Sequence, residues 1–171
     1  MLAKVNACAV IGLDGVVVDV EVDLTPGIKP PIIIVGLPDV SVQESRERVQ
    51  SAIRNTGLEY PRKRVRVNLA PATVRKEGSA YDLPIALGIL IANRQLPPQC
   101  LQDALVMGEL SLDGSVRHIR GVLPMAAVAR AQGYKRVCVP AEDAPEAAIF
   151  PDLEVIPVSS LADLFQHRHQ G

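Results

Sequence analysis

The stretch that decides the fold of this chain reads RKEGSAYDLPIALGIL and covers residues 75–90. A charged turn centred on Gly78 runs directly into an apolar segment, which predicts a helix over 81–93. Because this segment is nearly all apolar, we expect the helix to lie in the middle of the domain. Asp82 suits the start of a helix, and Pro84 is tolerated only in its first turn. Such a turn can present a side chain at a helix N-terminus, where unpaired N–H groups favour negative charge.

Outside this stretch the sequence alternates between strand and helix patterns, which predicts an α/β domain. Strands over 5–11 and 16–22 flank an Asp-Gly hairpin signal at residues 12–15. Residues 25–31 are rich in proline and glycine and indicate a loop. Further strands are expected at 32–35, 64–69, 105–109, 115–118, 136–139 and 153–157, with a second Asp-Gly hairpin at 113–114. Further helices are expected from Ser41 to a cap at Gly57, and at 122–132, 142–149 and 160–166.

Two signals predict the first of these helices. Ser41 and Glu44 have the spacing of a capping box, in which the two residues bind each other's backbone N–H groups. Gly57 can adopt the left-handed conformation that ends a helix. An apolar stripe at helical spacing should face the core. Its members are Val42, Val49 and Ile53, with Ser45 and Ala52 beside them.

Length and composition fit one ordinary folded domain. The chain has 171 residues, of which 48% are hydrophobic and 22% charged. Aromatic residues make up only 3%, with no tryptophan, which argues against a platform that stacks nucleic-acid bases. The net charge is −1, so the chain as a whole is no generic polyanion binder.

Cysteine spacing gives no metal motif. Cys8, Cys100 and Cys138 are widely separated and form no CxxC pair, so we expect three small buried side chains and no metal site. Without a signal peptide, the expected location is the reducing cytoplasm. The longest apolar runs are too short to span a bilayer, so no membrane partner is expected.

Several residues could be taken for a catalytic site. Ser79 would be a nucleophile only if a base lay nearby, and Lys76 belongs to the same turn. We therefore favour a structural role for Ser79 in shaping the turn. His118 lies in a hairpin between Arg117 and Arg120, and the other histidines are in the C-terminal tail. A Ser-His-Asp triad consequently has no well-placed histidine.

The turn and the segment after the second hairpin resemble the active site of Lon proteases. In that family the serine turn reads Lys-Asp-Gly-Pro-Ser-Ala-Gly, which aligns with residues 76–78 and places the serine on Ala80. The family's catalytic lysine follows a hairpin and a Gly-Gly-Leu turn. The matching residues are 108–123, which places the lysine on Leu123. The resemblance implies a catalytic dyad that is degenerate at Ala80 and Leu123, because neither side chain carries a hydroxyl or an amine.

Five separated motifs also resemble, in the same order, the N-terminal domain of the ComM/YifB family of magnesium-chelatase-like AAA+ ATPases. They read IVGLP at 34–38, SRERV at 45–49, VNLAPA at 67–72, KEG at 76–78 and DLPIA at 82–86. The resemblance extends from Gly12 to Phe165. It implies a Lon-protease-like α/β fold, with a two-layer mixed sheet and packed helices.

The same resemblance implies a domain organisation. Residues 1–166 would form a single Lon-like N-terminal domain, and the tail 167–171 should fray. The chain has no Walker motif, so it should bind no cofactor and no metal of its own. In the resembled family, an AAA+ module with ATP and Mg follows in the longer parent protein. The implied partners are this module and further copies of the protein in a hexameric ring, with DNA as a candidate third partner.

Charge is distributed unevenly along the chain. Residues 46–76 carry nine basic and two acidic side chains, which leaves about +7, whereas residues 141–165 carry six acids and no lysine or arginine. Arg62, Arg64 and Arg66 alternate along a predicted strand and would share one face. Together with Lys63 they could neutralise DNA phosphates. Alternatively, they form a solvated face that pairs with the acidic segment, within one chain or between subunits.

The resemblance therefore implies a non-catalytic assembly and DNA-guiding domain of a ring-forming AAA+ ATPase that acts in DNA branch migration during natural transformation. Two alternatives come from other classes of protein. One is an active serine protease domain with an unusual dyad, and the other is a chelatase-type subunit that acts on a metallation partner. A serine-directed activity probe separates the first alternative from the main hypothesis, and DNA binding separates the second.

Overall fold

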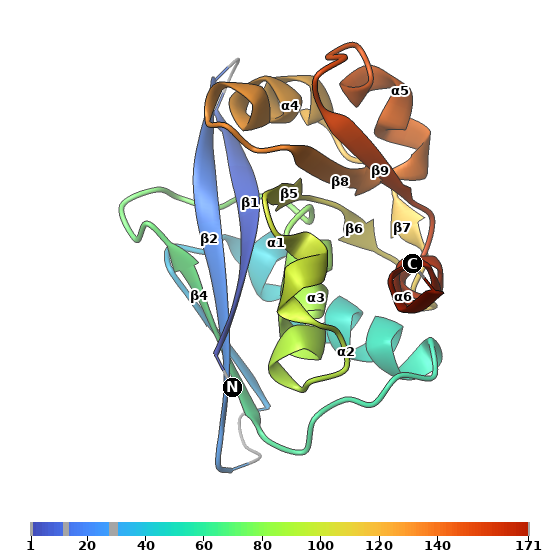
Figure 1. Ribbon diagram of the computed structural model, residues 1–171. Helices are drawn as coiled ribbons and strands as arrows, with labels where there is room; N and C mark the ends of the chain where they lie inside the picture. The colour runs from blue at the N-terminus through green and yellow to red at the C-terminus, as the bar shows by residue number, and fades with distance from the viewer. Residues whose placement is uncertain (1, 12–13, 28–30, 171) are drawn as a thin grey trace.

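The computed structural model describes residues 2–11, 14–27 and 31–170 (Figure 1). A mixed sheet has the strand order β3-β4-β2-β1-β5-β8-β9, and β6 pairs with β7 in a small second sheet. The strands are β1 Ala3–Ile11, β2 Asp14–Thr25, β3 Ile32–Val35, β4 Arg64–Ala70, β5 Ala104–Val106, β6 Glu109–Leu110, β7 Val116–Arg117, β8 Arg136–Pro140 and β9 Glu154–Val158. The helices are α1 Val40–Gln43, α2 Ser45–Asn55, α3 Asp82–Ala92, α4 Val122–Ala131, α5 Ala144–Ala147 and α6 Leu161–Gln170.

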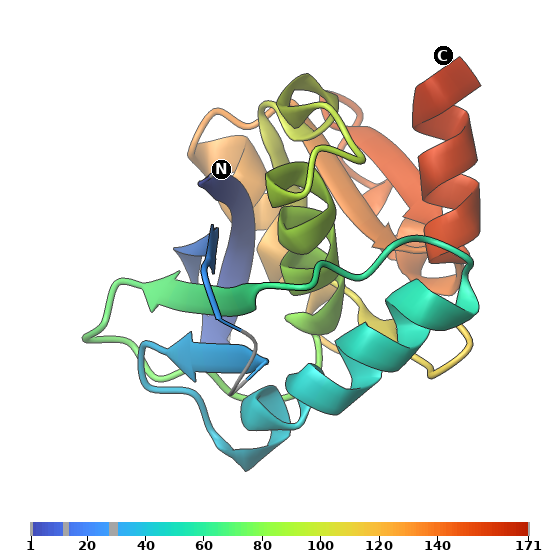
Figure 2. The ribbon, with the colours of Figure 1, turned by 90° about the horizontal axis from the view of Figure 1, so that it is seen from below.

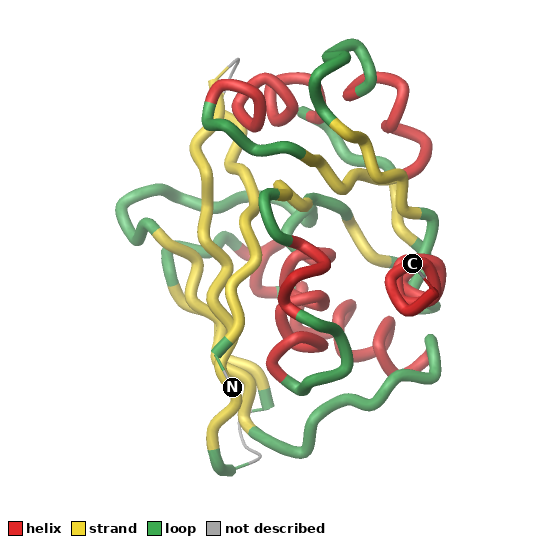
Figure 3. Tube along the Cα trace, viewed as in Figure 1, coloured by secondary structure: helices red, strands yellow, loops and turns green. Residues whose placement is uncertain are grey.

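The sheet has an antiparallel half and a parallel half. β1 and β2 form a long hairpin with Ala3 opposite Val22 and Ile11 opposite Asp14, and β2 pairs antiparallel with β4. β5, β8 and β9 then add in parallel beyond β1, and β3 lies parallel to β4 at the other edge. The mixed α/β fold expected from the alternating patterns is therefore confirmed (Figure 3). Gly12 and Leu13 of the predicted hairpin lie outside the described residues.

α3 is the centre of the domain, as its apolar sequence predicts. All eleven of its residues are buried, and it packs on β1 and β2 with α2 beside it (Figure 2). Gly88 allows this close approach, because a Cβ at this position would stand 2.6 Å from Cγ2 of Val22. α4 covers the far end of the opposite sheet face, where a Cβ on Gly15 would stand 2.5 Å from Val128. Because α4 covers only one end of the sheet face opposite α3, the rest of that face is left uncovered by the described helices.

The capping box predicted at Ser41 and Glu44 is wrong. The first helix begins one residue earlier, and its N-cap is Asp39, whose carboxylate accepts a hydrogen bond from the Val42 N–H at 2.8 Å. Asp39 has the extended backbone and the short carboxylate that an N-cap requires. Glu44 then joins α1 to α2. The predicted apolar stripe and the left-handed Gly57 cap are both confirmed.

Three other boundaries differ from expectation. The strand predicted at 105–109 is interrupted at Met107 and Gly108. The Met107 N–H still binds the Cys138 carbonyl of β8, but the Gly108 N–H turns away to the Ala80 carbonyl in the turn before α3. The helix predicted at 142–149 is a 3₁₀ turn, Ala141–Asp143, followed by the short α5. The last helix continues beyond residue 166 to Gln170.

The carboxylate of Asp82 connects α2, α3 and β6. It is fully buried and pairs with Arg48, with 2.6 Å between Oδ2 and Nε. It also accepts hydrogen bonds from the Ser45 hydroxyl at 2.5 Å and from the Leu110 N–H at 3.0 Å. The hydrogen bond to Asp82 raises the pKa of Arg48 above its ordinary value. A buried carboxylate with this many donors fixes the relative positions of the elements that supply them.

We expect Asp82→Ala to lower the free energy of unfolding by about 3–5 kcal/mol, because it leaves Arg48 without its buried counter-charge. Urea denaturation followed by circular dichroism measures the change. Asp152→Ala is the matched control, since it removes an exposed ion pair with Arg130 and should shift the midpoint far less. Equal losses in the two variants would contradict a central role for Asp82.

Candidate functional site

A cleft of about 810 Å³ separates the turn before α3 from the segment that leads into α4. Ser79 and Ala80 line one side, and Gly121 and Pro124 line the other, although about forty residues separate them in sequence. Leu123 lies at the start of α4, is 38% exposed, and is not among the lining residues in the described chain. The structure thus brings the degenerate serine position into the cleft and leaves the degenerate lysine position at its margin.

Neither of these two positions offers a reactive group. Ala80 carries only a methyl group, and its carbonyl accepts a hydrogen bond from the Gly108 N–H at 2.9 Å. Leu123 carries only an alkyl side chain. Ser79 also lines the cleft, and its carbonyl accepts a hydrogen bond from the Asp82 N–H at 3.2 Å. A nucleophile and its base therefore do not occur together at the positions where a Lon-type dyad would lie.

Lys76 has a structural role and is not a base for Ser79. It is fully buried, and its ammonium donates hydrogen bonds to the carbonyl of Gly36 at 2.8 Å and to the carbonyl of Pro71. Burial lowers the pKa of Lys76. Gly36 is required at its position, because a Cβ there would stand 2.1 Å from the Leu69 carbonyl oxygen. The ammonium thus ties two loops to the start of the turn and points at backbone rather than at a hydroxyl.

Asp39 fastens the same turn from the other side. Its second carboxylate oxygen accepts a hydrogen bond from the Gly78 N–H at 3.2 Å, and its own N–H donates to the Lys76 carbonyl at 2.9 Å. Gly78 has a φ of +86°, which favours glycine. The turn is therefore held by backbone contacts from two loops, independently of any catalytic group.

His118 and Asp143 form a pair at the opposite wall of the cleft, which the sequence patterns did not indicate. His118 Nδ1 lies 2.5 Å from Oδ1 of Asp143, whose other oxygen accepts from the Ile119 N–H at 2.9 Å. Asp143 is buried, while most of the His118 side chain is exposed. The hydrogen bond to Asp143 raises the pKa of His118. Twenty-five residues separate the pair, so no local motif reveals it.

His118 and Ser79 line the same cleft, although they are thirty-nine residues apart in sequence. Within the part of the chain that the structure describes, no hydrogen bond joins them. His118 is instead oriented by Asp143.

Several cations of the basic segment make contacts within the chain. Arg48 binds Asp82, Lys76 binds backbone carbonyls, and Arg75 pairs with Glu77 at 3.2 Å. The proposed DNA-contacting residues remain on or near the surface. Arg62 and Lys63 are exposed in the bend before β4, Arg66 is exposed within β4, and Arg64 is half-buried with its guanidinium beside Gly27.

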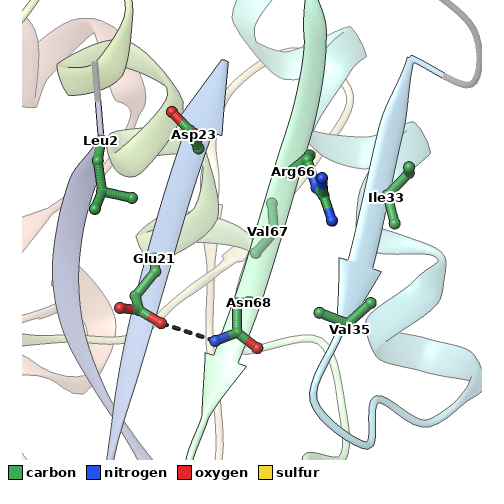
Figure 4. Close-up of a pocket in the computed structure, with 8 residues that line it drawn as sticks. All are labelled: Leu2, Glu21, Asp23, Ile33, Val35, Arg66, Val67 and Asn68. Atoms are coloured by element: carbon green, nitrogen blue, oxygen red, sulfur yellow. Dashed lines mark hydrogen bonds between the residues drawn. The ribbon is translucent and has the colours of Figure 1, made fainter. Parts of the chain in front are cut away.

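Arg64 and Arg66 share one face of β4, as predicted, but Arg62 and Lys63 precede the strand. Arg66 stands opposite Asp23 of β2, and the neighbouring Asn68 donates a hydrogen bond to Glu21 at 2.7 Å. Figure 4 shows Arg66, Asp23 and Glu21 around one hollow of about 310 Å³ on the uncovered face of the sheet. Arg62 and Lys63 instead line a different hollow, together with Arg54 and Tyr60. The antiparallel pairing of β2 and β4 thus places Asp23 beside Arg66 across the two strands.

The three cysteines are buried, as predicted. Burial raises the pKa of the Cys8 thiol to about 11, so it is an unreactive side chain at neutral pH. Across residues 2–11, 14–27 and 31–170, no three His, Cys, Asp or Glu side chains converge as metal ligands would. None of the described helices has the length and apolar character needed to cross a membrane.

The strand order, the central buried helix and the cleft at its N-terminus define a mixed α/β domain of the Lon-like type. The family model for subunit ChlI of Mg-chelatase matches residues 20–143. This chain therefore belongs to the Mg-chelatase ChlI family.

Individual relatives agree with this assignment. Competence protein ComM of Haemophilus influenzae is 42% identical over 166 residues, which cover 96% of this chain and 32% of that protein. Protein YifB of Escherichia coli is 42% identical over 134 residues, covering 78% of this chain and 26% of that protein. The archaeal Lon protease of Pyrococcus abyssi is more distant, at 26% identity over 174 residues, with 96% of this chain and 17% of the protease covered. The chain spans about a third or less of the length of these curated relatives.

We expect an NMR titration to give His118 a pKa above the ordinary value of about 6.5, because Asp143 stabilises the imidazolium. A raised histidine pKa means that the pair stabilises the fold below about pH 6.5, and that this contribution is lost as the pH rises through the raised value. Asp143→Asn should return the pKa of His118 toward its ordinary value. Glu142→Gln is the control, since it keeps the Asp143 contact and should preserve most of the shift. An unchanged pKa in Asp143→Asn would contradict this account.

Proposed function

We propose that this chain is a non-catalytic assembly and DNA-guiding domain of a ring-forming AAA+ ATPase of the ComM/YifB type. The observation that carries the proposal is a cleft held in shape by Lys76, Asp39 and the His118–Asp143 pair, with only alkyl groups at the two dyad positions. A domain that keeps its scaffold without a nucleophile and base is suited to binding or assembly rather than to peptide cleavage.

Membership of the ChlI family and the similarity to ComM support a larger ATPase as the parent protein. In this proposal the parent supplies an AAA+ module with its ATP and Mg, and copies of it form a ring, with six as the expected number. ComM is, by its name, a competence protein. By that similarity, the motor would act on DNA in branch migration during natural transformation, in the cytoplasm. This chain would contribute no cofactor or metal site.

Two other functions each have one observation in their favour. Ser79 and His118 line one cleft, which favours a serine protease with an unusual dyad. The match to the ChlI subunit favours a chelatase-type role on a metallation partner. The main proposal differs from the first in predicting no reactive serine, and from the second in predicting DNA binding.

We expect the chain to cleave neither casein nor peptides and to resist labelling by a fluorophosphonate, because Ala80 and Leu123 supply neither a nucleophile nor a base. Ala80→Ser alone or Leu123→Lys alone should restore nothing, since nucleophile and base act as a unit. Mass spectrometry locates any labelled residue. Cleavage that disappears in Ser79→Ala would refute the proposal and favour a protease.

We expect the full-length protein to bind DNA with an affinity that falls steeply with salt and depends little on sequence, because phosphate contacts release counterions. Reversing all four proposed contacts (Arg62→Glu, Lys63→Glu, Arg64→Glu and Arg66→Glu) should abolish most of this binding. Fluorescence anisotropy gives the affinity, and light scattering reports assembly.

The matched control reverses four exposed arginines outside the proposed set. They are Arg46, Arg75, Arg94 and Arg117. If both quadruple variants bind DNA with equal affinity, only the net charge of the domain affects binding. The proposed positions then form no DNA-binding surface. If the first variant loses assembly before it loses DNA binding, the basic residues belong to a subunit contact.

A further inference from the structure

A hollow of about 390 Å³ lies where the loop before β4 passes the C-terminal end of α2. We name it the cationic hollow. Its lining consists of Pro31, Arg54, Tyr60, Pro61, Arg62 and Lys63. Three of these six residues are cations, and no carboxylate lines the hollow in the part of the chain that the structure describes. The described lining of the hollow therefore carries three positive charges and no negative charge.

One of the three cations is held in place by an aromatic ring. The guanidinium carbon of Arg54 lies 5.1 Å from the centroid of the Tyr60 ring, within the range of a cation–π contact. The tyrosine is itself half-buried between the loop and the helix. Because a positioned guanidinium loses less rotamer freedom when it binds, Arg54 is better prepared for an anion than a freely moving surface arginine.

The neighbouring face of the sheet carries charges of both signs. Its cations are Lys4, Arg64 and Arg66, and its acids are Asp19, Glu21 and Asp23. Arg66 stands opposite Asp23, and the carboxylates on this face repel a phosphate backbone and offset the attraction of its cations. The cationic hollow differs from this face because no carboxylate of the described chain is among its lining residues.

The acidic segment does not neutralise the cationic hollow within one chain. No ion pair of the described chain involves Arg54, Arg62 or Lys63. Three of the six acids are engaged elsewhere, since Asp143 and Glu142 bind His118 and Asp152 pairs with Arg130 at 2.9 Å. Pairing between the two segments of a single chain is therefore not the reason for the basic cluster.

We infer that the cationic hollow is the site where this chain binds the phosphates of a nucleic-acid backbone, through Arg54, Arg62 and Lys63, and that Arg66 takes no part. The inference rests on the proposed DNA-guiding function and narrows it to one surface. Arginine can bind a phosphate through two parallel N–H groups, and lysine adds a point charge, so the three cations suit a phosphodiester group. Such contacts read no base sequence.

The test compares single charge deletions in the full-length protein. Arg62→Gln, Lys63→Gln and Arg54→Gln are each paired with Arg66→Gln, which removes the same charge from the adjacent acidic face. Binding to a labelled single-stranded oligonucleotide of mixed sequence is followed by anisotropy between about 50 and 200 mM salt. Each deletion in the cationic hollow should lower the salt slope by about 0.7 and weaken binding at about 50 mM salt roughly tenfold, whereas Arg66→Gln should change neither.

A second pair of variants tests the placement of Arg54. Tyr60→Leu removes the ring and should weaken DNA binding toward the level of Arg54→Gln, whereas Tyr60→Phe keeps the ring and should bind as the unchanged protein does. Thermal unfolding of both variants identifies any loss of binding that comes from unfolding alone. If Tyr60→Leu and Tyr60→Phe are both folded and bind DNA with equal affinity, the Tyr60 ring has no role in the site.

The outcomes separate this inference from the function on which it rests. If Arg66→Gln weakens binding as much as Arg62→Gln, the inference fails while the DNA-guiding function stands. If no variant changes the affinity or the salt slope, neither survives. If the deletions in the cationic hollow lower the molecular mass by light scattering and leave DNA affinity per subunit unchanged, the hollow binds a neighbouring subunit, and the inference is overturned.

Discussion

The buried carboxylate of Asp82 is the contact on which the rest of the domain depends. It accepts hydrogen bonds from Arg48 and Ser45 of α2 and from the Leu110 N–H of β6, while it belongs to the first turn of α3. An unpaired charge at this depth would cost several kcal/mol, so these donors cannot be displaced independently. Because β6 leads through its hairpin to one wall of the cleft, the same carboxylate also sets the distance between the two walls.

The cleft is maintained by polar groups whose partners are all internal. Lys76 donates hydrogen bonds to two backbone carbonyls, and Asp39 accepts hydrogen bonds from the Gly78 and Val42 N–H groups. Asp143 binds the His118 ring and the Ile119 N–H. Lys76 and Asp143 are buried, and without these contacts their charged groups would have no partner. The shape of the cleft therefore needs neither a serine nor a lysine at the positions of Ala80 and Leu123.

Charge counted along the sequence is a poor guide to charge on the surface. The segment 46–76 has a net charge of about +7, yet Arg48 pairs with Asp82 and Lys76 binds backbone carbonyls inside the domain. Arg66 then faces Asp23 because β4 pairs with β2, a strand from a part of the sequence that carries acids on alternate positions. Of the remaining cations, Arg54, Arg62 and Lys63 come together at the end of α2. Strand pairing, rather than local composition, decides where an anion would be attracted.

The sequence by itself determined the elements and their buried faces. The apolar run of α3, the stripe of α2, the alternation in β4 and the burial of all three cysteines were predictable, because burial leaves a periodic apolar pattern in neighbouring residues. Only the tertiary structure decided that Asp39 rather than Ser41 caps the first helix, that His118 meets Asp143, and that the basic residues divide between two surfaces. These contacts join side chains from distant segments, and no local periodicity records which polar partner lies across the fold.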